Sequence, residues 1–146
     1  MRTKGGNLVY VKVARWDYEL VQTAEELTIY DALSRFEDAP VPRLLAYVHE
    51  ETPARVIGFA LEALQGRYAT SQDLEEVQIA LRQLHSVGVA IGKVSLLKVI
   101  MTVNGPKFVD LAGATMRTEC DAETFQRLVA KDLMSLFEGL DCSIRK

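Results

Sequence analysis

The chain has 146 residues, is 49% hydrophobic and 25% charged, and carries a formal net charge of -3, which is typical of one globular domain and excludes a disordered chain. Its lysines and arginines are scattered along the sequence, so the pattern excludes the basic surface of a typical nucleic-acid-binding protein. No apolar run approaches the ~20 residues that a membrane-spanning helix needs, and we therefore expect neither nucleic acid nor a membrane as a partner.

The N-terminal part of the chain predicts a strand followed by a helix. Residues 8–14 are rich in β-branched side chains and follow turn residues, which favours a strand. Thr23 and Glu26 have the spacing of a helix N-terminal capping box, and apolar residues then recur at helical spacing as far as Phe36. A helix that begins earlier, near Asp17, is the alternative.

The middle of the chain predicts two strands and a second helix. Residues 43–48 and 55–64 are expected to pair as an antiparallel hairpin. Ser71 is a good N-cap for the helix that follows, acidic residues occupy its first turn, and Gly88 ends it.

The last part predicts a short hairpin and a third helix. Asn104 and Gly105 are a strong turn signal between the apolar runs 99–103 and 108–111. A final helix is predicted over residues 122–140, with Asp121 as its cap. Its expected buried face consists of Phe125, Leu128, Val129, Leu136 and Phe137.

These elements predict an α+β fold in a single domain, residues 1–146. A small antiparallel sheet and one helix occupy the first half, and a helical second half contains the short β-hairpin. Gly66 is the expected boundary, so that residues 1–65 form a first lobe and residues 66–146 a second.

Five local patterns occur in the same order as in a known superfamily. They are a lysine-bearing strand at 11–13, Glu26 in the first helix, a strand exit at 61–64, the segment 84–93, and a strand ending at Asp110. Together they resemble the protein-kinase-like superfamily, and most closely its compact His-Gly-Asp branch of aminoglycoside-phosphotransferase-like and fungal kinase-like proteins. The resemblance implies a minimal kinase-like fold with a reduced N-lobe and a truncated C-lobe.

The resemblance also implies a nucleotide site. In that family a strand lysine oriented by a helix glutamate reaches the phosphates, backbone groups of the segment joining the lobes hold the adenine, and an aspartate binds metal. The corresponding residues here are Lys12, Glu26, Glu62 and Asp110. For Lys12 and Glu26, an exposed strand lysine and a capping-box glutamate are the simpler alternatives.

The catalytic positions depart from the family pattern. Ile91 stands in place of the family's histidine, Lys93 in place of the catalytic aspartate, and Lys98 in place of the metal-binding asparagine. A protonated lysine cannot accept a proton from a substrate. No glycine-rich phosphate loop precedes Lys12, so we expect no catalytic residues, no resident metal and no cofactor. Lys93 and Lys98 are expected to pair with Asp110, with Lys93 facing it from its loop; contact of the two lysines with the phosphates of a nucleotide or with another anion is the alternative.

The expected function is therefore a non-catalytic, pseudokinase-like binding or regulatory module that acts through an unidentified protein partner. An atypical phosphotransferase or nucleotide-binding protein that uses Lys93 and Asp110, or another enzyme that uses His85, is the alternative, as is weak binding of a nucleotide or another anion.

Cys120 and Cys142 are too few for a disulfide framework and predict reduced thiols in a cytoplasmic protein. A secreted effector that has lost its leader would show the same features.

Overall fold

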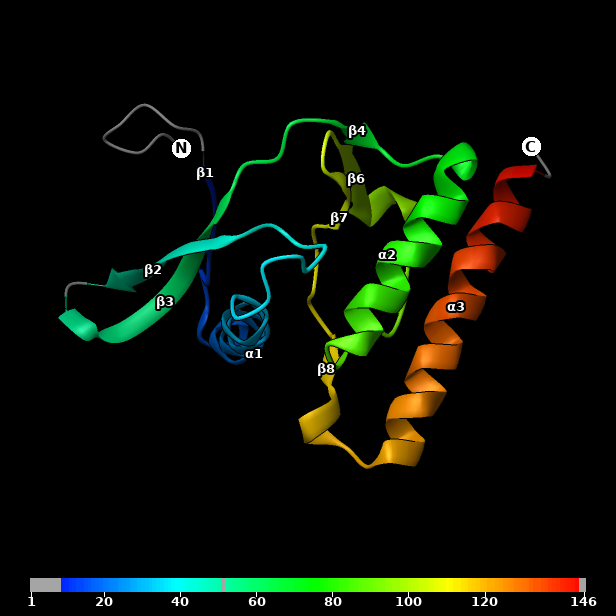
Figure 1. The fold of residues 1–146 in the computed structure, drawn as a ribbon. Helices are drawn as coiled ribbons and strands as arrows, with labels where there is room; N and C mark the ends of the chain where they lie inside the picture. The colour runs from blue at the N-terminus through cyan, green and yellow to red at the C-terminus, as the bar shows by residue number, and fades with distance from the viewer. Residues whose placement is uncertain (1–8, 51, 145–146) are drawn as a thin grey trace.

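The computed structural model describes residues 9–50 and 52–144 and has a mixed α+β architecture, as the sequence predicts (Figure 1). The helices are α1 (Asp17–Leu33), α2 (Leu74–Ser86) and α3 (Ala122–Ile144). The strands are β1 (Val9–Val13), β2 (Leu44–Glu50), β3 (Thr52–Glu62), β4 (Arg67–Tyr68), β5 (Val89–Ala90), β6 (Val99–Thr102), β7 (Gly105–Phe108) and β8 (Thr115–Met116).

The first half forms a three-stranded antiparallel sheet in the order β1-β3-β2, packed against α1. The predicted strand over residues 8–14 is confirmed in its described part, and residue 8 lies outside the described residues. The predicted hairpin of residues 43–48 and 55–64 is confirmed as β2 and β3, which are longer than expected.

The first helix begins at Asp17, so the capping-box interpretation of Thr23 and Glu26 is wrong. The backbone N–H of Arg15 donates to the carboxylate of Glu19 at 2.7 Å, and acidic residues in the first turn complement the positive end of the helix dipole. The helix ends at Leu33, before Phe36, whose side chain is exposed rather than buried.

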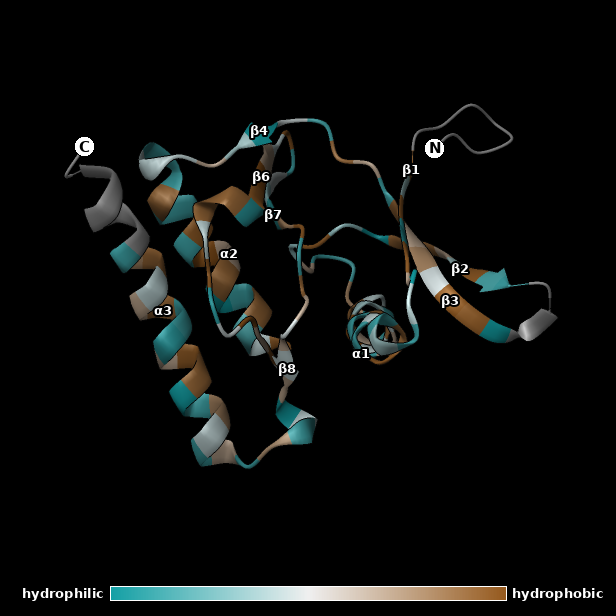
Figure 2. Ribbon diagram, turned by 180° about the vertical axis from the view of Figure 1, so that it is seen from behind, coloured by the Kyte–Doolittle hydropathy of each residue, from teal (hydrophilic) through white to brown (hydrophobic). Residues whose placement is uncertain are grey.

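The second half contains a three-stranded antiparallel sheet, β4-β6-β7, and a two-stranded one, β5-β8. Helices α2 and α3 lie side by side (Figure 1), and apolar residues alternate with hydrophilic ones along both (Figure 2). The predicted hairpin is confirmed as β6 and β7, but its second strand begins at Gly105 rather than Phe108. Gly105 adopts a φ of 103°, which favours glycine at this turn position.

The second helix is preceded by a one-turn 3-10 segment, which shifts its cap from the predicted Ser71. Thr70 and Asp73 form a reciprocal capping box instead. Gly88 follows the helix with a φ of 96°, as expected of a residue that ends a helix. The cap at Asp121 is confirmed, because its side chain accepts the N–H of Thr124 at 2.7 Å.

One continuous hydrophobic core joins the two halves. Ile29 and Phe59 from the first half belong to the same buried cluster as Leu81 and Phe108 from the second. The backbone N–H of Phe108 also donates to the carbonyl of Pro40 at 2.8 Å. Elements on either side of Gly66 are therefore held in a defined relation to each other.

None of the helices in the described part of the chain combines the length and the apolar character required to cross a membrane.

Candidate functional site

A cavity of about 490 Å³ lies between the first sheet and the β4-β6-β7 sheet. Its walls come from β1, α1, the end of β3, the residues after it, β6 and the segment after β7. All four residues predicted for a nucleotide site line this one cavity. They are Lys12, Glu26, Glu62 and Asp110.

Lys12 and Glu26 form an ion pair across the interface between β1 and α1. The Lys12 Nζ lies 2.5 Å from the Glu26 Oε2, and the glutamate side chain is only 4% exposed. Burial by itself lowers the pKa of Lys12, but the hydrogen bond and charge of Glu26, helped by Asp110, outweigh it and raise this pKa above its usual value. The earlier start of α1 places Glu26 well inside the helix, where it can reach the strand.

Glu62 is the last residue of β3 and is hydrogen-bonded to Arg43, which lies directly before β2. Its carboxylate accepts the backbone N–H of Arg43 at 2.9 Å, and its own N–H donates to the Arg43 carbonyl at 3.0 Å. Ala63 and Leu64 follow it along the edge of the cavity.

Asp110 follows β7 and pairs with Lys98, not with Lys93. The Lys98 Nζ lies 3.5 Å from the Asp110 Oδ2, while the other carboxylate oxygen accepts the N–H of Ala112 at 3.0 Å. Lys93 is exposed and lines a different cavity, of about 570 Å³, beside α3. The expectation that Lys93 faces Asp110 is therefore corrected, because the ion pair of this aspartate is made by Lys98.

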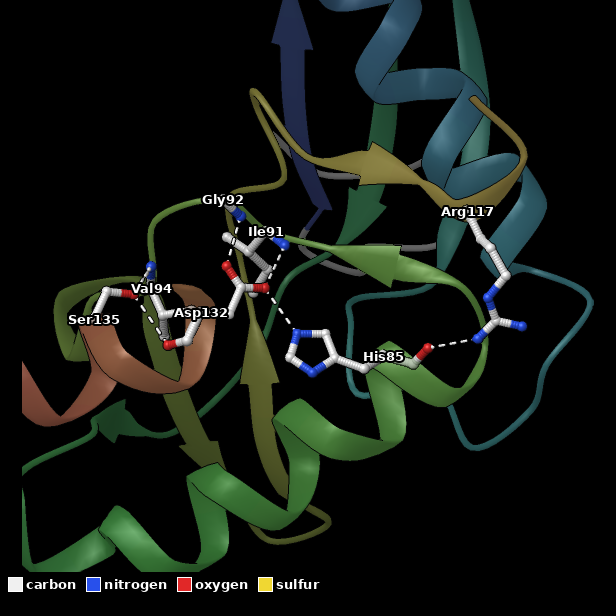
Figure 3. A network of polar contacts seen from close by, with 7 residues as sticks. All are labelled: His85, Ile91, Gly92, Val94, Arg117, Asp132 and Ser135. Carbon is white, nitrogen blue, oxygen red and sulfur yellow. Dashed lines mark hydrogen bonds and ion pairs between the residues drawn. The ribbon is translucent and has the colours of Figure 1, made fainter. Parts of the chain in front are cut away.

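The segment of residues 91–94 is held by a buried carboxylate, Asp132 of α3, which the sequence pattern did not single out (Figure 3). Asp132 is 0% exposed. Its Oδ2 accepts the N–H of Ile91 at 2.8 Å and lies 2.7 Å from the Nε2 of His85, and its Oδ1 accepts the N–H of Gly92 at 2.7 Å. Because a carboxylate only accepts, His85 donates through Nε2.

Two further contacts extend this network (Figure 3). Ser135, one helical turn after Asp132, accepts the N–H of Val94 at 3.1 Å, and Arg117 donates to the backbone carbonyl of His85 at 3.1 Å. Residues 91–94 are thus tied to α3 through their backbone. The Ile91 side chain is buried in the core, so that position has a packing role.

A signal for Asp132 was present in the helical pattern. It lies on the apolar stripe of α3 with Phe125, which is buried, and Leu136, which is 1% exposed. A charged residue on a buried helix face needs polar partners there. The predicted Phe137, by contrast, is 45% exposed and does not belong to the buried face.

No protein-family model matches this chain, and no curated protein matches it at a significant level.

Proposed function

We propose that this protein is a non-catalytic binding module built on a reduced kinase-like fold, with residues 1–65 as the first lobe and 66–146 as the second. The gathering of the Lys12–Glu26 pair, Glu62 and Asp110 around one cavity supports the resemblance. In a kinase-like site, catalysis depends on positioning the phosphates and neutralising their charge. Lys93 and Lys98 stand where the resemblance places the catalytic aspartate and the metal-binding asparagine.

The ion pair between Lys98 and Asp110 carries this proposal. The one carboxylate in the position of a metal ligand has an ammonium group 3.5 Å away. Lys93, in the position of the catalytic base, lines another cavity. An enzyme that used Lys93 and Asp110 together would need both side chains at one substrate, and this separation argues against that alternative.

The experiment is incubation of the purified chain with radiolabelled ATP, Mg²⁺ or Mn²⁺, and protein and small-molecule acceptors. We expect no label transfer. The double variant Lys93→Asp with Lys98→Asn restores the family's charges, and we expect it to stay inactive because residues 1–11 contain no glycine-rich phosphate-loop motif. Transfer by the wild type that disappears in Asp110→Ala would overturn the proposal.

For the partner we propose a protein that docks at the start of α1. Trp16, Tyr18 and Val21 are 62%, 73% and 63% exposed there, and Tyr18 and Val21 share a helix face. Tryptophan and tyrosine are enriched at the centres of protein interfaces. The first turn of the helix carries Asp17 and Glu19 and no basic residue, so the partner segment should be basic as well as apolar.

The partner surface is tested by purifying partners from the native organism with the wild type and with the double variant Trp16→Ala, Tyr18→Ala. Val103→Ala is the matched control, because Val103 is 100% exposed on the far β6-β7 turn. The same partners should be recovered with the wild type and the control and lost with the double variant. Equal recovery with all three chains would refute this surface.

A further inference from the structure

Helix α3 has an apolar patch on the side that faces away from the rest of the protein. Met134 and Phe137 are 63% and 45% exposed, and because they are three residues apart they are neighbours on the helix surface. Met134 lies two residues from the buried Asp132, and in a helix of 3.6 residues per turn this spacing places the two side chains on opposite sides. The other side of the helix packs against α2 and β5. The patch therefore lies on the outer face of the helix, at one edge of the molecule (Figure 1).

Two opposite charges beside this patch have no partner. Lys131 and Glu138 are both exposed, and neither forms an ion pair with any side chain that the structure describes. The seven residues between them correspond to about two helical turns, so both lie on the same flank of α3. They are about 10 Å apart along the helix axis, which is too far for them to pair with each other. Their charges are available to another chain.

The patch and the two charges are complementary to a second copy of themselves. In a two-fold dimer with antiparallel α3 helices, a residue before the axis in one copy meets a residue at a similar distance after it in the other. The midpoint between Met134 and Phe137 and the midpoint between Lys131 and Glu138 both fall next to Ser135. One axis there brings Met134 of each copy against Phe137 of the other. The same axis brings Lys131 of each copy against Glu138 of the other.

Both contacts are favourable and select the antiparallel direction. A methionine sulfur packs well against an aromatic ring, and an axis perpendicular to both helices brings the same flank of each copy together, as the pairing of Lys131 with Glu138 requires. Each contact forms twice in the dimer. Parallel helices would instead place lysine beside lysine and glutamate beside glutamate, which is unfavourable.

We propose that this protein forms an antiparallel two-fold dimer through the outer face of α3. The contact of one helix face is smaller than the roughly 800 Å² per partner of a standard stable interface, so the dimer forms in a concentration-dependent way. Helices α1 and α3 lie on opposite sides of α2 (Figure 1), so the dimer leaves the start of α1 open in both copies. It would present two such surfaces to a partner with two binding sites, but its formation does not depend on that partner.

The test is sedimentation equilibrium of the full chain from about 1 µM to about 1 mM, a range that covers the Kd of weak complexes. We expect a monomer at the low end and a dimer at the high end. Lys131→Glu and Glu138→Lys each place like charges at both symmetry-related contacts, so each should weaken self-association at least about tenfold. Val103→Ala is the control, because Val103 is fully exposed on the β6-β7 turn; it should dimerise as the wild type does.

Mixing the two charge variants makes the test specific to this pairing. When the Lys131→Glu chain meets the Glu138→Lys chain, opposite charges face each other again at both contacts, so the mixture should associate more tightly than either variant alone. This recovery also shows that both variants are folded. A wild type that stays monomeric at the highest concentration, a dimer that neither single variant weakens, or a mixture that associates no better than its components would each refute the proposal.

Discussion

Replacing Asp132 by asparagine tests whether one buried carboxylate holds the loop of residues 91–94. The carboxylate has three partners, the two backbone N–H groups of Ile91 and Gly92 and the ring of His85. The amide of the Asp132→Asn variant would present one oxygen and one NH2 group. Since Ile91 and Gly92 donate to different oxygens, one of these backbone N–H groups faces the NH2 group in either orientation of the amide.

The expected cost follows from that mismatch. A buried donor left without an acceptor costs about 1–3 kcal/mol, and hydrogen bonds to charged groups are worth about 1.5–3 kcal/mol. We therefore expect Asp132→Asn to lower the free energy of unfolding by about 2–4 kcal/mol. For a chain of this size that corresponds to a fall in Tm of about 5–15 °C.

The assay is urea denaturation of the wild type and the variant, with hydrogen exchange of the Ile91 and Gly92 amides, which should lose protection in Asp132→Asn. Glu123→Gln is the control on the same helix, because its pair with Arg127 is exposed and such pairs contribute about 0–1 kcal/mol. A loss below about 1 kcal/mol for Asp132→Asn, with unchanged protection of both amides, would refute the anchoring role.

Two other predictions follow from the ion pairs. Glu26→Ala leaves Lys12 without its buried partner and should lower the free energy of unfolding by about 1–3 kcal/mol in urea denaturation. Because the pKa of Lys12 is raised in the folded protein, the contribution of the pair is present below the unfolded pKa of about 10.4 and is lost as the pH rises through the folded value. A wild type and variant that differ in stability by the same amount at neutral and at strongly alkaline pH would contradict this prediction. The hydrogen bonds from Arg67 and from the Thr70 backbone lower the pKa of Asp73. The contribution of Asp73 to stability is therefore present above the unfolded pKa of about 3.9 and is lost as the pH falls through the folded value. In thermal melts, Asp73→Asn should lose less stability than the wild type below about pH 4, and plots of Tm against pH that run parallel for the two proteins would contradict this prediction.

Local sequence patterns were sufficient where an element depends on its own residues. Alternating β-branched residues identified β1, and turn residues identified the β6-β7 hairpin, because both signals act over a few neighbouring positions. Asp121 was identified as a cap for the same reason, since its partner, the N–H of Thr124, is three residues away. The resemblance to the kinase-like superfamily predicted Lys12 and Asp110 in one site, and both line one cavity.

Only the tertiary structure decided the contacts between distant parts of the chain. The sequence left two starts for α1 open, and the packing of the helix on the sheet brings Glu26 to Lys12, 14 residues away. Lys98 ends the 3-10 turn directly before β6 and reaches Asp110, whereas Lys93, five residues earlier, lines the other cavity. Asp132 meets its histidine partner over 47 residues of sequence. A buried charge acquires partners at such separations only when the chain folds, so no local pattern could name them.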